Sequence, residues 1–268
     1  MLECVVNLSE GRDRVLVDEI ARAGAPSLLD LHSDPWHNRS VLTLAGPHLA
    51  TSLRSLSRAA AGLLDLRVHE GVHPRIGVLD VVPFAPVGPR AFVDPLDEAV
   101  AARDEFARWA GEDLALPCFL CGPERSLPEV RRSAWSTLAP DTGPRVPHPT
   151  AGAACVGARR PLVAFNLWLA SPDVALARHV AAAVRGPGVR ALGLPVGDTA
   201  QVSCNLVSPL ETGPGALYDA VSSLAPVEHA ELVGLVPLAV LEREPRGRWA
   251  RLDLSEDRTV ESRLASLR

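Results

Sequence analysis

The stretch from residue 27 to residue 46, SLLDLHSDPWHNRSVLTLAG, contains two apolar runs on either side of a polar turn. The runs cover residues 27–31 and 40–46, and the residues between them include Ser, Asp, Pro and Asn, which favour turns. Short apolar runs bounded by turn residues are typical of β-strands. We therefore predict two consecutive strands at this point of the chain.

Helical patterns lie on both sides of these two strands. Residues 9–23 begin with Ser9, which can cap a helix, and their apolar residues then recur every three to four positions. Residues 47–64 show the same spacing, with leucines at positions 49, 53 and 56. We therefore predict one helix before the two strands and one after them.

Further out, short apolar runs at residues 2–7 and 76–84 predict an outer strand at each end of this segment. The predicted order of elements is then β-α-β-β-α-β, which is the order of a ferredoxin-like unit. Residues 96–110 and 115–121 predict a further helix and a further strand. A stretch rich in Pro and Gly, residues 140–157, interrupts the pattern.

The same order of elements returns in the second half of the chain. The predicted strands cover residues 162–169, 189–194, 200–206 and 231–236, and the predicted helices cover residues 171–185 and 213–224. We therefore predict an α/β protein, more closely an α+β arrangement of two ferredoxin-like units with mixed sheets and outer helices. The subdomains are expected at residues 1–157 and 158–268, with a cleft or tunnel between their sheets as the ligand site.

Composition restricts the chemistry. The 268 residues carry a formal net charge of −5, and all 27 basic residues are arginines. The absence of lysine excludes Schiff-base chemistry and the lysine-containing P-loop. An anionic ligand must then be held by arginine, by backbone N–H groups or by a metal. The acidic balance is also unlike that of a nucleic-acid-binding protein.

The start of the chain lacks the basic and apolar segments of a secretory signal peptide. The longest uncharged apolar run, residues 232–241, is about half as long as a membrane span. We therefore expect a cytoplasmic protein that does not bind membranes. The five cysteines are expected to be reduced and mostly buried.

Two motifs resemble metal sites. Residues 69–73, HEGVH, match the H-E-x-x-H pattern of zinc proteases, which needs both histidines on one face of a helix. Pro74 follows directly and disfavours that helix, so a zinc hydrolase is the weakest alternative. Cys118 and Cys121 form a lone C-x-x-C on a predicted strand, where residues three apart point to opposite faces. We therefore predict no metal.

His73 enters a predicted strand directly before Pro74 and Arg75. One interpretation is a loop histidine held by hydrogen bonds at the start of the strand. The other is a proton shuttle, because an imidazole with a pKa of about 6.5 exchanges protons at neutral pH. The polar residues 33–40 are likewise either a solvated loop or part of a site.

Seven blocks of sequence resemble the formiminotransferases, the folate-dependent glutamate formiminotransferases of histidine breakdown, in their bacterial single-activity form. The blocks are ECVVNLSEG at residues 3–11, HNRSV at 37–41, GVHPRIG at 71–77 with Asp80 and the PF at 83–84, APD at 139–141 with HPTAG at 148–152 and GAR at 157–159, LVAFNL at 162–167, AQVS at 200–203 with Asn205, and LVGLVP at 232–237. They stand in the family's order and cover nearly the whole chain.

The resemblance implies a homodimer of two-subdomain chains whose sheets enclose a folate tunnel. It implies transfer of a formimino group from N-formimino-glutamate to N5 of tetrahydrofolate, which is a co-substrate. The family's catalytic histidine precedes Pro-Arg, so that role carries over to His73. Substrate or folate binding carries over to Asn7, Asn38, Arg39, Arg75, Asp141, His148, Thr150, Gly152, Arg159 and Gln201. Because lysine is absent, Arg39, Arg75 and Arg159 are the candidates for binding carboxylates.

One residue departs from the family pattern beside the catalytic position. Val72 replaces a glutamate of the family, which removes a carboxylate that could orient the imidazole. Two alternatives therefore stay open beside the leading interpretation. One is formyl or formimino transfer involving another amine, and the other is a folate-binding protein without catalysis.

Overall fold

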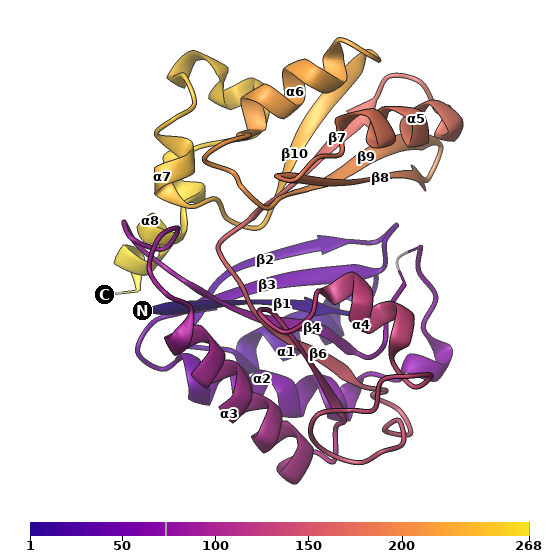
Figure 1. The fold of residues 1–268 in the computed structure, drawn as a ribbon, viewed down its shortest axis with the longest axis vertical. Helices are drawn as coiled ribbons and strands as arrows, with labels where there is room; N and C mark the ends of the chain where they lie inside the picture. The colour runs from indigo at the N-terminus through magenta and orange to yellow at the C-terminus, as the bar shows by residue number, and fades with distance from the viewer. Residues whose placement is uncertain (73, 268) are drawn as a thin grey trace. The chain divides into compact units, whose positions relative to one another are not determined.

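The computed structural model describes residues 1–72 and 74–267. The chain divides into two compact units, Met1–Arg160 and Pro161–Ser266, each built around its own β-sheet (Figure 1). No helix in the described part of the chain is long and apolar enough to cross a membrane.

The sheet of the first unit has six strands in the order β2-β3-β1-β4-β6-β5. Its strands are β1 (Leu2–Leu8), β2 (Leu28–Asp34), β3 (Arg39–Ala45), β4 (Leu79–Pro86), β5 (Cys118–Cys121) and β6 (Ala154–Ala158). The first four strands in this order pair antiparallel, whereas β6 pairs parallel with both β4 and β5. The sheet is therefore mixed, as predicted.

Helices cover both faces of this sheet. The three longer helices of the unit, α1 (Arg14–Ala23), α2 (Leu49–Leu63) and α3 (Asp97–Asp113), share one apolar core with alternate residues of the strands. The short helix α4 (Leu127–Ser133) packs on the opposite face, where Val130 joins a second cluster with Phe119 and Cys155. The strands β5 and β6 are thus buried on both sides.

The sheet of the second unit has four antiparallel strands in the order β10-β7-β9-β8. The unit consists of β7 (Val163–Leu169), α5 (Val174–Val184), β8 (Val189–Val196), β9 (Thr199–Leu206), α6 (Pro214–Ser222) and β10 (Val227–Val233), followed by the short helices α7 (Leu238–Leu241) and α8 (Val260–Ser266). Chain order and strand order both repeat those of β1 to β4. The structure therefore confirms the α/β class and two ferredoxin-like units. The subdomains 1–157 and 158–268 stay a prediction as independent domains.

The expected start of the first helix was wrong. Helix α1 begins at Arg14 and is capped by Asp13, whose carboxylate accepts from the N–H groups of Val15 and Leu16. The hydroxyl of Ser9 instead donates to the carbonyl of Gly77 at 2.8 Å. Ser9 is thus used to join two loops of the first unit.

A strand and a short α-helix of the first unit were not predicted, and neither were α7 and α8 of the second unit. Strand β6 consists of five buried residues, ACVGA, and begins within the Pro- and Gly-rich stretch at residues 140–157 that interrupts the predicted pattern. A strand that is buried on both faces shows no alternation of apolar and polar residues, so its sequence carries no period of two. Helix α4 has only seven residues, too few for an apolar periodicity to stand out.

Candidate functional site

Asn38, in the turn between β2 and β3, joins two other loops of the first unit. Its backbone is left-handed, with φ of 46°, a conformation that Asn adopts more readily than most residues. Its Oδ1 atom accepts from the N–H of Gly11 at 2.9 Å, and its Nδ2 atom donates to the carbonyl of Glu70 at 2.8 Å. The same Nδ2 lies 3.3 Å from Nδ1 of His69. Asn38 therefore ties the loop at Gly11 and the loop at Glu70 to the turn between β2 and β3.

Two glycines permit this close packing. A Cβ atom on Gly11 would lie 2.4 Å from the carbonyl oxygen of Asp34 and 2.6 Å from the backbone nitrogen of Arg39. A Cβ on Gly71 would lie 2.6 Å from the carbonyl oxygen of His37. Neither position has room for a side chain. The glycines of the two motifs at residues 3–11 and 71–77 are thus explained by packing.

Three arginines gather at this junction, and we call Arg39, Arg75 and Arg131 the arginine cluster. The guanidinium of Arg75 donates to the carbonyls of Asn38 at 3.2 Å and His37 at 3.3 Å and also contacts Nε2 of His69. Arg131 of α4 donates to Asp80 of β4 at 2.5 Å. Arg39 is half-buried, and among the described residues its side chain makes no hydrogen bond or ion pair.

The charges of this cluster do not balance. Asp80 is only 3% exposed, and its burial raises the pKa of the carboxyl although Arg131, Arg39 and Arg75 oppose the shift. Burial lowers the pKa of the Arg39 guanidinium, which nevertheless stays charged at neutral pH. The three arginines thus act on the buried carboxylate of Asp80, and Asp34 is a second carboxylate that acts on Arg39. Arg131 is paired with Asp80, so within the described part of the chain the charge of Arg39 is the one that favours an anionic ligand.

His69 is neutral in this setting. Burial, and then the charge of Arg75, lower the pKa of its imidazole to about 4. Its backbone is extended, with φ of −84° and ψ of 129°, so His69 does not start the helix that the zinc-protease motif requires. Among the residues that the structure describes, no group of three or more His, Cys, Asp or Glu could hold a metal ion. The absence of a metal stays a prediction.

The end of the predicted folate segment pairs with residues 76–78, a few positions after His73. In the loop at residues 148–152, Nδ1 of His148 accepts from the N–H of Ala151 at 3.0 Å, and Thr150 approaches the same atom. This loop then pairs with the chain before β4: the N–H of Val78 donates to the Ala151 carbonyl at 3.0 Å. Gly152, with φ of 71°, stands opposite Gly77. His73 itself lies outside the described residues.

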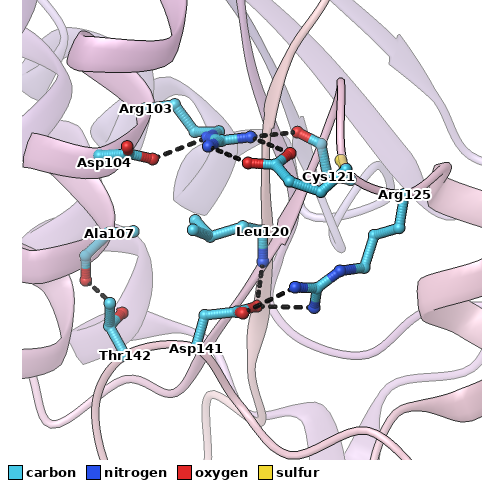
Figure 2. A network of polar contacts seen from close by, with 9 residues as sticks. Arg103, Asp104, Ala107, Leu120, Cys121, Arg125, Asp141 and Thr142 are labelled. Atoms are coloured by element: carbon cyan, nitrogen blue, oxygen red, sulfur yellow. Dashed lines mark hydrogen bonds and ion pairs between the residues drawn. The ribbon is translucent and has the colours of Figure 1, made fainter.

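Asp141, another residue of the predicted folate segment, is an anchor of its own loop (Figure 2). Its two carboxylate oxygens accept from the guanidinium of Arg125 at 2.8 and 3.0 Å, and one of them also accepts from the N–H of Leu120 at 2.8 Å. These bonds attach the loop to the end of β5. A role of Asp141 in binding folate stays a prediction.

The remaining predicted residues are spread over both units. Asn7 lies on β1 between Val41 and Val81 of the neighbouring strands. Arg159 follows β6, and its guanidinium donates to the carbonyl of Arg160 at 2.9 Å. Gln201 lies on β9 of the second unit. The first unit therefore brings Asn38, Arg39 and Arg75 together, beside the loop that carries His148, Thr150 and Gly152.

Sequence reasoning missed Arg131 as a member of the site. It is placed by α4, whose N-terminus has a capping box in which Ser126 and Glu129 bind each other's backbone N–H. The pattern Ser-x-x-Glu at residues 126–129 is a helix-start signal that could have revealed this helix. Nothing in the sequence pairs Arg131 with Asp80, since 51 positions separate them.

The two cysteines of the lone C-x-x-C point to opposite faces of the sheet, as predicted for residues three apart on a strand. Cys118 belongs to the apolar core under α3, whereas Cys121 belongs to the cluster under α4 on the other face. All five cysteines are free and buried. Burial raises the pKa of Cys118 to about 12, so this thiol stays protonated.

Comparisons with known proteins agree with this arrangement. Residues 1–159 match the formiminotransferase domain, N-terminal subdomain. Over 274 residues the chain is 33% identical to a glutamate formimidoyltransferase of Streptococcus pyogenes serotype M1, and the match covers 90% of each chain. A glutamate formimidoyltransferase of Thermoplasma acidophilum is 32% identical, with 88% of each chain covered.

A formimidoyltransferase-cyclodeaminase of Sus scrofa is 35% identical over an alignment of 280 positions, which covers 90% of this chain and 51% of that protein. The chain thus spans about half the length of this relative and nearly the whole length of the two microbial ones. These matches relate the protein to transferases of one-carbon groups. Within that class, the chain belongs to the formiminotransferase family.

Proposed function

We propose that this protein transfers the formimino group of N-formimino-glutamate to N5 of tetrahydrofolate. The observation that carries the proposal is the alignment of nearly the entire chain with two proteins named glutamate formimidoyltransferase. The motif residues at 37–41, 71–77 and 148–152, which resemble the family, also pack against one another in the first unit. Their proximity supports a shared site.

The proposed reaction needs one group that moves two protons. N5 of the folate attacks the amidine carbon, a carbon–nitrogen bond forms, and a tetrahedral intermediate results. The bond from that carbon to the glutamate nitrogen then breaks once this nitrogen is protonated. We assign both transfers to His73, which accepts a proton from N5 and delivers one to the leaving amine. A shuttle of this kind accelerates a reaction by ~10²–10⁴-fold.

The carboxylates of the two substrates need cationic partners. Arg39 is the best-supported candidate, because its half-buried side chain makes no bond within the described part of the chain. Arg75 lies beside it and Arg159 follows β6 of the same unit. Arginine can bind a carboxylate through two parallel hydrogen bonds. Folate contacts of Asn7, Asn38, Asp141, His148, Thr150, Gly152 and Gln201 belong to the same proposal.

Val72 favours a second candidate function. Its apolar side chain is 44% exposed and stands where the resemblance expects a glutamate beside the catalytic histidine. Without that carboxylate, the site offers less to balance an amidinium substrate. Transfer of a formyl or formimino group to or from another amine is therefore the alternative, and folate binding without catalysis is the third.

A tetrahydrofolate-dependent assay separates these functions. Purified protein is incubated with tetrahydrofolate and N-formimino-glutamate, and released glutamate is measured beside reactions with formyl-glutamate and simple amidines. We expect glutamate release from N-formimino-glutamate that requires folate and is lost in His73→Asn. Faster turnover of another donor would favour the second function. Folate binding by calorimetry with no turnover would favour the third.

We also propose that the protein is a cytoplasmic homodimer. Light scattering coupled to size-exclusion chromatography tests the dimer, for which twice the chain mass of 28.5 kDa is expected. A mass of one chain at the assay concentration would contradict it.

A further inference from the structure

The segment that follows His73 is held by side chains from two other elements. The carbonyl oxygen of Pro74 accepts a hydrogen bond from Nη1 of Arg131. The N–H of Ile76 donates to Oδ1 of Asp80 at 2.9 Å. The two contacts are joined, because Nη2 of Arg131 donates to Oδ2 of Asp80 at 2.5 Å. One ion pair thus binds backbone groups one and three residues after His73.

Both members of this ion pair are themselves well placed. Asp80 lies on β4 and its side chain is 5% exposed, while that of Arg131 is 21% exposed. Arg131 projects from α4, which is fixed by its capping box and by the buried side chain of Val130. The ion pair therefore fixes the backbone beside His73 relative to the packed helix α4 and the central strand β4.

Arginine is the side chain that suits this contact at position 131, because it offers two donor nitrogens in one rigid group. Two terminal nitrogens of one guanidinium reach the Pro74 carbonyl and the Asp80 carboxylate at the same time. A lysine carries a single ammonium on a flexible stem and is a poor substitute at such a two-point contact. A neutral residue would leave Asp80 buried without its charged partner and release the carbonyl.

We propose that Arg131 and Asp80 are positioning residues, which hold the backbone after His73 so that this histidine meets the bound substrate in the reactive geometry. The inference rests on the proposed function, since it assigns proton transfer to His73. Arg131 acts through the backbone of the segment. Its loss should therefore lower kcat while KM changes little, because a displacement of about 1 Å at reacting groups can cost ~10²-fold in rate.

Steady-state kinetics of three variants test this proposal. In Arg131→Met we expect kcat to fall by ~10- to 100-fold, with KM for both substrates within about threefold of wild type. Arg131→Lys keeps a charge near Asp80 and should recover part of the lost kcat. Arg132→Met is the matched control, because Arg132 is the exposed neighbour on the same helix. It should retain wild-type kinetics.

Thermal melting of each variant accompanies the kinetics. If Arg131→Met is unfolded at the assay temperature, Arg131→Lys decides: a reduced kcat at unchanged KM supports the positioning role. Wild-type kcat in a folded Arg131→Lys overturns it, since a point charge would then suffice. A loss of activity that appears only as a raised KM also overturns it.

The same assay separates this inference from the proposed function. Wild-type protein that releases no glutamate in the presence of folate overturns the proposed function and the inference with it. An active wild type that depends on His73, together with unchanged kcat in both Arg131 variants, overturns the inference alone.

Discussion

Arg39 differs from the other members of the arginine cluster because the fold does not use its guanidinium. Arg75 and Arg131 donate to backbone carbonyls, and Arg131 also neutralises Asp80. Arg39 makes no such bond among the described residues, although it is half-buried. A cation placed this way is available to a ligand, and the surrounding low dielectric strengthens its attraction for a carboxylate.

We expect Arg39→Lys to raise the dissociation constant of the carboxylate substrate that it binds while the melting temperature stays the same. Loss of a charge-assisted hydrogen bond costs ~1.5–3 kcal/mol, which corresponds to ~10- to 100-fold in affinity. Isothermal calorimetry with N-formimino-glutamate and with tetrahydrofolate measures the change. Arg54→Lys is the control, because Arg54 pairs with Glu105 at an exposed position of α2. Equal affinities for both ligands in Arg39→Lys would remove Arg39 from the site.

His69 makes the free energy of unfolding of the protein depend on pH. Its pKa is about 4 in the folded chain, against 6.5 for the unperturbed group. The unfolded chain therefore binds more protons between these values, so this contribution to stability is present above pH 6.5 and is lost as the pH falls towards 4. We expect His69→Asn to lose less melting temperature between pH 7 and pH 4.5 than the wild type.

Thermal melts in matched buffers measure this difference. Replacement of the exposed His48 by Asn is the control and should leave the pH dependence of the wild type unchanged. The same loss of melting temperature in His69→Asn as in the wild type would contradict the lowered pKa of His69.

At the scale of elements, the entry to β4 depends on a close contact between two loops. Residues 76–78 and 151–153 run antiparallel, with the N–H of Ala153 donating to the Ile76 carbonyl at 2.9 Å. A Cβ atom on Gly77 would lie 1.8 Å from the carbonyl oxygen of Ala153. Only glycine permits these backbones to pack, and the contact aligns the loop at residues 148–152 with the segment after His73.

We expect Gly77→Ala to lower the free energy of unfolding by ~1–3 kcal/mol, the cost of forcing extra atoms into a packed region. Activity should fall with it, because the two loops can no longer pack. Gly62→Ala on α2 is the control, since its Cβ would meet no atom within 4 Å. That change should stabilise the helix by ~0.5–1 kcal/mol. Denaturant titration gives both values, and a stability of Gly77→Ala equal to wild type would refute the steric argument.

At the scale of the whole molecule, every basic side chain is an arginine, and the sole primary amine is the N-terminus. The structure places that amine 3.6 Å from Glu98, at an exposed position. Cationic contacts of the protein with anionic substrates therefore depend on guanidinium groups rather than on lysine ammonium groups.

We expect an amine-acylating reagent to attach to Met1 and to leave activity within about twofold of the untreated protein, because no lysine takes part in binding. An arginine-selective dicarbonyl should abolish activity, and saturating substrate should slow that loss. Mass spectrometry counts the modified groups. Full inactivation by acylation of the single amine would show that the N-terminus contributes to the site.

The sequence predicted several residues of the candidate site, and their roles stay predictions. Residues 37–41 and 71–77 were recognised as blocks, and the structure shows Asn38 and Arg75 in contact between them. The contribution of Arg131 was not recognised, because this residue comes from a seven-residue helix outside those blocks. Asp141 was assigned to the folate segment, whereas the structure shows its carboxylate engaged by Arg125. Ion pairs of this kind join residues far apart in the chain.

The amino-acid sequence by itself determined most of the order of strands and helices in both units, because apolar periodicity, caps and turn residues act over a few neighbouring positions. The family followed from the resemblance of seven blocks of sequence. Strand β6 escaped this reasoning since a strand buried on both faces has no period. Only the tertiary structure decided which charges meet at the site and that, among the described residues, the side chain of Arg39 makes no hydrogen bond or ion pair. Those choices depend on how α4 packs on β5 and β6, and packing brings together side chains whose separation in the chain carries no signal.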